Sequence, residues 1–405
     1  MASIAILGFG IVGGGIACVL DENADKIAIS AGEKVELKYI LDLREFPDSP
    51  YADRVIHDIQ PILDDPDVTV VCEAMGGVHP ALEFSLRAMK AGKSVVTSNK
   101  EVVAKHGDEL LACAAECGVD YLYEAAVGGG IPVIRSLKTS LASEKIKAIT
   151  GILNGTTNYI ITRMTEDGCD FADALSEAQS LGYAEKDPSA DIDGLDAQRK
   201  IIILTAIASG KLLPEEAVFC ETTRHLTPDD IAAAKTLGTS VRLLGCYRSG
   251  EKPAAYVAPF IVPGSTPLAH ISDVYNGIWA EGETTGDVMY YGRGAGRYPT
   301  AGAMISDVCA AVSGAAKAEY PKTWTRIEAS EAADFDLIPF GYYVRVNTDD
   351  RDRAVSAIEN AVGDITVLCD SPAGTVGFTT ASAFTRPQIM TALADFDIAS
   401  LIRIL

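Results

Sequence analysis

The first hundred residues alternate short apolar runs with turns that contain glycine or polar side chains. Residues 3–20 begin with an apolar run, continue through a glycine-rich turn and end with the spacing of a helix. Similar apolar runs open residues 35–44 and 68–77 and recur within 91–100. Short apolar runs at this spacing predict buried strands of a parallel sheet with helices between them. The sequence therefore indicates the α/β class for this part.

The turn within residues 3–20 has the spacing GxGxxG, formed by Gly8, Gly10 and Gly13. The first glycine allows a tight turn, the second lets the backbone approach a pyrophosphate, and the third lets the helix pack on the strand. Asp42 ends the second run, where a dinucleotide-binding unit bonds the ribose. We predict a doubly wound Rossmann-type domain, with a glycine turn of some other α/β domain as the alternative.

The choice between NAD and NADP stays open at this stage. Asp42 favours NAD because it would repel a 2′-phosphate, whereas Arg44, two residues further on, could pair with that phosphate. The residues expected at the cofactor are Gly8, Phe9, Gly10, Ile11, Val12, Gly13, Asp42, Arg44, Gly76, Lys100 and Gly296.

The last sixty-odd residues show a different pattern. Apolar alternation predicts strands at 342–347, 364–369, 375–380 and 398–405, and helical spacing predicts helices at 351–362 and 386–396. This βαββαβ order is the ferredoxin-like arrangement. We expect a separate C-terminal domain over residues 335–405.

Residues 184–200 contain five acids and three bases and lead directly into an almost wholly apolar segment. The pattern predicts a helix from Asp193 or Gly194 to Gly210, with Asp196 and Lys200 on one face that Ile203 and Ile207 continue. A half-buried lysine beside a carboxylate has an adjustable pKa and can take or return the proton of an alcohol during hydride transfer. The alternative is a solvated turn without catalytic function.

Composition limits the classes of function. A chain of 405 residues with 48 % hydrophobic residues predicts two or three domains, and a net charge of −22 argues against nucleic acid as a partner. The nine cysteines are dispersed and the five histidines show no metal spacing, which favours free thiols in a reducing compartment. No apolar segment has the length of a membrane helix, so we expect a soluble, cytoplasmic chain without a membrane partner.

Five segments together resemble homoserine dehydrogenases. They are residues 74–104, 123–134 and 151–160, the run from Ala178 to Lys200 with its A-x3-G, DP and DIDGLDAQRK elements, and residues 291–308. The resemblance extends in order over residues 3–325. It implies an NAD(P)-dependent dehydrogenase that interconverts L-homoserine and L-aspartate 4-semialdehyde in threonine and methionine biosynthesis, and a homodimer. Because the glycine turn begins at Gly8, we expect a monofunctional chain with no preceding kinase.

The resemblance also implies roles for individual residues. Lys200 matches the catalytic lysine and Lys100 the second active-site lysine. Asp196 matches a carboxylate that supports Lys200 or binds substrate. Glu185, Asp191 and Tyr183 match substrate-binding positions. The implied domains are a nucleotide domain at 1–135 completed by about 295–325, a substrate and dimerisation domain at 136–294, and the tail at 335–405.

A glycine-rich bend with one acid follows at residues 123–134. Its backbone carbonyls beside a carboxylate suit a hard cation. The resemblance implies a monovalent cation, sodium in most family members, held by Glu124, Val127, Gly129 and Ile131. A tight turn without an ion is the alternative.

The tail resembles the ACT domains that some homoserine dehydrogenases carry, but its first strand-to-helix turn reads NTDDRDRAV and lacks the glycine common at ACT ligand sites. The backbone therefore has less room for an amino acid. Regulation by threonine and a dimer-forming role are both open.

Two other functions remain at this stage. One is a related oxidoreductase acting on another amino-acid semialdehyde, although none of the cysteines lies in an acylating motif. The other is a catalytically silent, NAD-binding regulator, against which the presence of both Lys100 and Lys200 argues.

Overall fold

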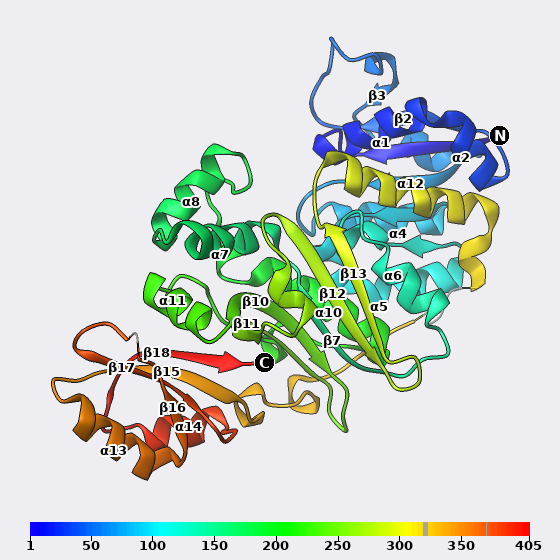
Figure 1. Cartoon of the computed structure of the whole chain (residues 1–405). Helices are drawn as coiled ribbons and strands as arrows, with labels where there is room; N and C mark the ends of the chain where they lie inside the picture. Colours follow the sequence, from blue (N-terminus) through cyan, green and yellow to red (C-terminus); the bar gives the residue numbers. More distant parts are fainter. Residues whose placement is uncertain (319–322, 370) are drawn as a thin grey trace. The chain divides into compact units, whose positions relative to one another are not determined.

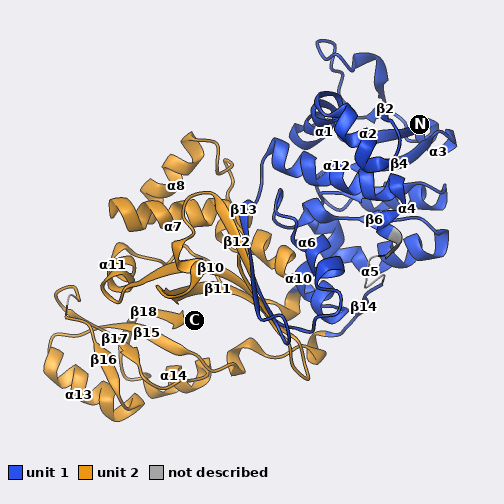
Figure 2. Cartoon of the chain, turned by 45° about the vertical axis from the view of Figure 1, so that its right-hand side comes forward, with its two compact units in different colours: residues 1–147, 202–215, 280–328 blue, residues 148–201, 216–279, 329–405 orange. Residues whose placement is uncertain are grey.

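The structure is a computed structural model that describes residues 1–318, 323–369 and 371–405 (Figure 1). The chain divides into two compact units, coloured separately in Figure 2. Unit 1 contains residues 1–147, 202–215 and 280–328, and unit 2 contains residues 148–201, 216–279 and 329–405. None of the helices in the described ranges combines the length and apolarity that crossing a membrane requires.

Unit 1 is built on a parallel six-stranded sheet in the order β3-β2-β1-β4-β5-β6. This is the Rossmann order, which confirms the predicted doubly wound sheet. The order reverses between β1 and β4, and the carboxyl ends of these strands are where such sheets bind ligands. The strands are β1 (Ala2–Leu7), β2 (Val35–Leu41), β3 (Val55–Ile56), β4 (Val68–Glu73), β5 (Ser94–Thr97) and β6 (Tyr121–Leu122).

Helices cover this sheet. Helix α12, late in the chain, packs beside α1 and α2 (Figure 1). Its Met304 and Val308 join Ile4 of β1 and Ile16 of α1 in one buried core, which explains why residues so far apart in sequence form one unit. The helices are α1 (Ile11–Glu22), α2 (Ala24–Ala31), α3 (Gln60–Asp64), α4 (Ala81–Lys90), α5 (Lys100–Cys117), α6 (Val133–Arg135) and α12 (Arg297–Ser313). Unit 1 also contains β8 (Lys211–Leu212), β13 (Asp287–Arg293) and β14 (Thr325–Arg326).

Unit 2 is a mixed sheet with helices. Its strands follow the order β12-β7-β10-β11-β18-β15-β17-β16, with β9 paired to β11. The strands outside the tail are β7 (Ile146–Ile152), β9 (Phe219–Cys220), β10 (Thr239–Arg248), β11 (Ala254–Pro263) and β12 (Tyr275–Gly282). The helices outside the tail are α7 (Gly155–Asp167), α8 (Phe171–Ser180), α9 (Ser189–Ile192), α10 (Leu195–Ser209, which continues into unit 1) and α11 (Pro228–Thr236).

The tail has the predicted βαββαβ order of elements. They are β15 (Gly341–Asn347), α13 (Arg351–Val362), β16 (Ile365–Val367), β17 (Thr375–Thr380), α14 (Arg386–Ala392) and β18 (Asp397–Ile404). Helix α14 ends four residues before the predicted end, because Leu393 leaves the helix and is buried in the tail's own core. Strand β18 pairs in parallel with β11 at Phe260 and Ile261, so the tail's strands continue the sheet of unit 2.

Candidate active site

The glycine turn of unit 1 lies between β1 and α1. Gly8 has φ of +90°, and a Cβ on Gly13 would lie 2.0 Å from the Gly8 carbonyl oxygen, so both positions require glycine. A Cβ on Gly10 would meet nothing within 4 Å, which leaves open space beside the backbone where α1 begins. No acid occupies the first turn of α1. This cradle and the exposed N–H groups of a helix start suit a pyrophosphate.

Asp42 follows β2 and closes the other side of the turn. Its Oδ2 accepts a hydrogen bond from the Phe9 N–H at 2.7 Å, and Arg44 donates to both carboxylate oxygens through Nε and Nη2 at 2.9 Å. These Arg44 contacts lower the pKa of Asp42 and keep it ionised. The Arg44 side chain is 62 % exposed, so its guanidinium is accessible to a ligand phosphate.

A buried carboxylate connects the turns that carry Gly76 and Lys100. Glu73 ends β4, and its side chain accepts hydrogen bonds from the Met75 N–H at 2.8 Å and from the Thr97 hydroxyl at 2.5 Å. The Thr97 oxygen in turn accepts from the Asn99 N–H at 2.9 Å. Burial raises the pKa of Glu73 to about 7. Sequence reasoning missed Glu73; the signal was an acid as the last residue of an otherwise apolar strand.

The other predicted cofactor residues of unit 1 include Ile11 and Val12, the first two residues of α1, and two residues at the starts of other helices. Lys100 is the first residue of α5, which Asn99 caps by accepting from the Val102 N–H at 3.2 Å. Asn99 also donates to the Gly77 carbonyl at 2.7 Å, so the turn of Lys100 is tied to the turn after β4. Gly296, with φ of +118°, precedes α12.

Glu124 lies buried at the start of the predicted cation loop. Its two carboxylate oxygens accept from the N–H groups of Ile134 and Arg135 at 2.9 and 2.6 Å. Burial and Asp307 raise the pKa of Glu124 to about 7. A cavity of about 340 Å³ opens beside it, lined by Glu124, Gly130, Ile131, Pro132, Arg135, Tyr298, Pro299, Gly302, Ala303 and Ser306.

The remaining cation-loop residues are closely packed. Val127 and Ile131 are buried, and a Cβ on Gly129 would lie 2.7 Å from the Gly294 carbonyl group. Among the described residues, no group of three or more His, Cys, Asp or Glu side chains is arranged to hold a metal ion. A cation in this loop would therefore bind mainly backbone oxygens.

Lys200 is the centre of a buried polar cluster in unit 2. Its Nζ donates to Asp196 Oδ2 and to the Leu153 carbonyl, both at 2.7 Å, and the side chains of Lys200 and Asp196 are each 9 % exposed. The helix that carries them begins at Leu195, slightly later than predicted, because Gly194 has φ of +82° and cannot join the helix. The predicted end is right, since Gly210 follows the last helical residue with φ of +72°.

Asn154 extends this cluster to a second carboxylate. Its Nδ2 donates to Asp196 Oδ2 at 2.8 Å and to Asp191 Oδ1 at 2.7 Å, while its Oδ1 caps α7 by accepting from the Thr157 N–H at 2.8 Å. Burial and Asp196 raise the pKa of Asp191, whereas the Asn154 hydrogen bond lowers it. Sequence patterns did not show this bridge between the acids, because it depends on a contact between residues 37 positions apart.

Two predicted substrate residues lie outside this cluster. Glu185 is exposed, and its backbone carbonyl accepts from Gln179 Nε2 at 3.0 Å. Tyr183 is 44 % exposed, and its ring packs edge-on against Tyr159 with a centroid separation of 5.0 Å. The structure therefore brings Lys200, Asp196 and Asp191 together and leaves Glu185 and Tyr183 on the preceding loop.

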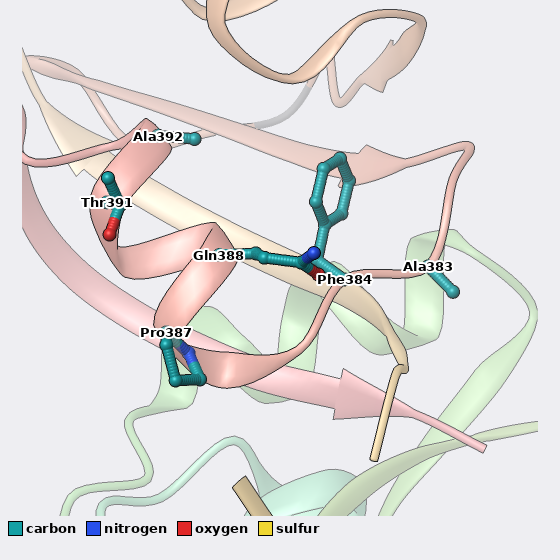
Figure 3. Close-up of a pocket in the computed structure, with 6 residues that line it drawn as sticks. All are labelled: Ala383, Phe384, Pro387, Gln388, Thr391 and Ala392. Carbon is teal, nitrogen blue, oxygen red and sulfur yellow. The ribbon is translucent and has the colours of Figure 1, made fainter. Parts of the chain in front are cut away.

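The tail contains an open groove of about 560 Å³ (Figure 3). Its lining is apolar apart from one amide and one hydroxyl, and consists of Ala383, Phe384, Pro387, Gln388, Thr391 and Ala392. None of these lining residues carries a charge to pair with an amino or carboxyl group of an amino acid.

Comparisons with known proteins agree with this geometry. The family model of homoserine dehydrogenase matches residues 132–309, and the model of the homoserine dehydrogenase NAD binding domain matches residues 8–124. The chain is 43 % identical over 311 residues to a homoserine dehydrogenase of Synechocystis, covering 75 % of this chain and 72 % of the relative. It is 38 % identical over 359 residues to that of Corynebacterium glutamicum, covering 86 % and 80 %.

Solved structures give the same result. A homoserine dehydrogenase from Thiobacillus denitrificans superposes with a TM-score of 0.87 at 31 % identity, over 100 % of this chain and 98 % of that one. A hyperthermophilic archaeal homoserine dehydrogenase in complex with NADPH superposes with a TM-score of 0.66 at 26 % identity, over 76 % and 97 %. With its NAD(P)-binding sheet and these matches over most of its length, the chain belongs to the homoserine dehydrogenase family.

Proposed function

We propose that this chain catalyses the reversible oxidation of L-homoserine to L-aspartate 4-semialdehyde, with Lys200 handling the hydroxyl proton. The observation that carries the proposal is the buried Lys200–Asp196 pair, joined to Asp191 through Asn154 by contacts of 2.7–2.8 Å. A family member with this pair has a buried amine that can exchange a proton with the alcohol and a carboxylate that positions this amine.

The proton follows a short route in this proposal. A nicotinamide cofactor held by the glycine turn of unit 1 would supply the acceptor for a hydride from the alcohol carbon of homoserine. Lys200 takes the hydroxyl proton as that hydride leaves and returns it in the reduction direction. Asp196, whose Oδ2 lies 2.7 Å from Nζ, holds the amine in position. The Leu153 carbonyl fixes the direction of the amine.

The amino group of the substrate needs an acidic partner. We assign that role to Asp191 and Glu185. We assign substrate contact also to Tyr183, which lies on the same loop as Glu185. Lys100 is assigned to the nicotinamide side. Asp191 suits the role because Asn154 holds its carboxylate, and Glu185 because its carboxylate is exposed and available. An ammonium group on Asp191 would also offset the cost of its burial.

For the cofactor, we propose that Gly8, Gly10 and Gly13 hold the pyrophosphate and that Arg44 determines the preference. With Arg44 on Asp42, the pair presents no net charge to the ribose, and a 2′-phosphate would attract the exposed guanidinium. Both NAD and NADP are therefore expected to bind.

We also propose a monovalent cation at Glu124, with the carbonyls of Val127, Gly129 and Ile131. The buried carboxylate and the tight packing of the loop support this donor set. Sodium against choline as the added cation, with thermal stability as the readout, tests the assignment without requiring turnover.

For assembly, we propose a homodimer in which the tail is an ACT-like module. An uncharged groove and a first turn without glycine argue against threonine as its ligand. Light scattering on the purified chain, with and without threonine, tests both points.

The experiment for the reaction is spectrophotometric. We expect NADH or NADPH to form when L-homoserine is added, and no turnover with L-serine, whose hydroxyl is one carbon closer to the amino group. Absence of turnover with either cofactor would refute the proposal.

A further inference from the structure

Residues 219–224 form a short strand and loop that contact two functional parts of unit 2. The strand, β9, pairs in parallel with β11, and the Glu221 N–H donates to the Val257 carbonyl at 2.9 Å. One side of this segment contacts the turn before α10, and the other contacts the tail.

The contacts with the turn before α10 are dense. Arg224 donates to Asp193 through Nε at 2.7 Å and Nη2 at 3.2 Å, and the Thr222 hydroxyl donates to Asp193 Oδ1 at 2.9 Å. The Thr223 N–H donates to the Ile192 carbonyl at 3.0 Å. Asp191 lies in α9, two residues before Asp193, so the segment contacts the end of the helix that carries the proposed ammonium partner.

The contacts with the tail centre on Arg403 of β18. Its Nη1 donates to Glu221 Oε2 at 2.5 Å, and its guanidinium lies 5.3 Å from the Phe219 ring centroid and 4.6 Å from that of Phe335. The two rings stack with centroids 4.4 Å apart. The Arg403 side chain is only 4 % exposed, so both its charge and its planar face are used in fixing this segment.

We propose that Arg403 is a positioning residue for the substrate site, through which the tail holds the helix that carries Asp191. The inference rests on the proposed function. Without Arg403, Glu221 loses the hydrogen bond from this guanidinium, and the Phe219 and Phe335 rings lose their contact with its planar face, so residues 219–224 shift toward water. The Asp193 contacts shift with them, and Asp191 loses the position that substrate binding requires, where displacements of about 1 Å matter.

The tail supplies a matched control in Arg345. This arginine of β15 is also almost buried, with a side chain 9 % exposed, and it pairs with Asp230 at 3.1 Å. Its partners are Asp230 of α11 and the helix cap Thr227, which follow residues 219–224 in the chain. Arg403→Met and Arg345→Met therefore each remove one buried ion pair between the tail and the rest of unit 2. Only Arg403→Met removes a contact with residues 219–224.

The test measures kcat and both KM values in the full-length chain. In Arg403→Met we expect the KM for L-homoserine to rise about tenfold, with kcat changed less than threefold and the KM for NAD(P) unchanged. Arg345→Met should lower thermal stability and leave both KM values unchanged. Glu221→Gln replaces Arg403→Met if that variant does not fold.

Combining Arg224→Met with Arg403→Met shows whether the two arginines affect the KM for L-homoserine through the same segment or independently. If both arginines act through residues 219–224, the double variant has the KM of the worse single variant rather than the product of both effects. An unchanged homoserine KM in Arg403→Met, or equal changes in Arg403→Met and Arg345→Met, would overturn the inference. A wild-type chain without homoserine turnover would instead overturn the proposed function.

Discussion

Asn154 offers the sharpest test of how the substrate carboxylates are held. Asn154→Ser keeps a side chain that caps helices about as well as asparagine, so the start of α7 is preserved. The serine hydroxyl is too short to reach both Asp191 and Asp196, which now accept from Nδ2 at 2.7 and 2.8 Å. The substitution therefore removes the bridge between the two acids and little else.

The magnitude follows from these two contacts. Each hydrogen bond to a charged group contributes about 1.5–3 kcal/mol, so losing both lowers the free energy of unfolding by about 3 kcal/mol at the low end of that range. The low end applies because Asp191 is half-buried and water replaces part of what is lost. The KM for L-homoserine should rise at least about tenfold, which corresponds to about 1.4 kcal/mol.

The pH dependence of kcat/KM for L-homoserine gives an independent test of the role of Asn154. Asn154 lowers the pKa of Asp191 against the raising effects of burial and Asp196. Its loss lets that pKa rise further, so the carboxylate becomes protonated at higher pH. The acid limb of kcat/KM for homoserine should move to higher pH, measured from steady-state rates between pH 5 and 9.

Thr157→Val is the control for this variant. The Thr157 hydroxyl also contacts Asn154, donating to Oδ1 at 3.0 Å, but it does not reach the acids. This control should leave the KM for homoserine and the acid limb unchanged. An Asn154→Ser enzyme with wild-type KM and wild-type pH profile would refute the bridging role.

Four further variants test unit 1. Gly13→Ala places a Cβ 2.0 Å from a carbonyl oxygen and should lower the melting temperature, whereas Gly10→Ala meets nothing and should keep that temperature while weakening NAD(P) binding, followed by fluorescence titration. Arg44→Ala should raise the KM for NADP more than that for NAD; equal changes would contradict its role. Burial raises the pKa of Glu73 to about 7, and an acid with a raised pKa loses its stabilising contribution as pH rises through that value. In urea unfolding, the free energy of unfolding of Glu73→Gln relative to the wild type should therefore increase by about 3 kcal/mol between pH 5 and pH 8. A difference that does not change with pH would contradict the raised pKa of Glu73.

The sequence predicted the elements better than the contacts between them. Gly8, Gly10 and Gly13 could be identified because their roles depend on local backbone geometry and a fixed spacing. The face shared by Asp196 and Lys200 could be predicted from helical periodicity alone. Helix α14 was predicted too long because burial of Leu393 in the tail's core, a tertiary effect, outweighs local helical spacing.

Contacts between segments that are distant in the chain could not be predicted from the sequence. Asn154 reaches Asp196 across 42 positions, and Glu73 reaches Thr97 across 24. The position of Glu73 as the last residue of β4 is a usable sign, but its partner depends on which strands become neighbours. The roles of Lys100, Glu185 and Tyr183 rest on resemblance and remain predictions.

The most direct test of the central claim is the rate of NAD(P)H formation from L-homoserine by the wild type and Lys200→Met. Methionine fills a similar volume but can neither take a proton nor pair with Asp196. We predict that kcat falls by about 10²–10⁴-fold, while cofactor binding, which relies on unit 1, is unchanged. A folded Lys200→Met variant with near wild-type kcat would contradict the assignment of Lys200 as the residue that handles the hydroxyl proton.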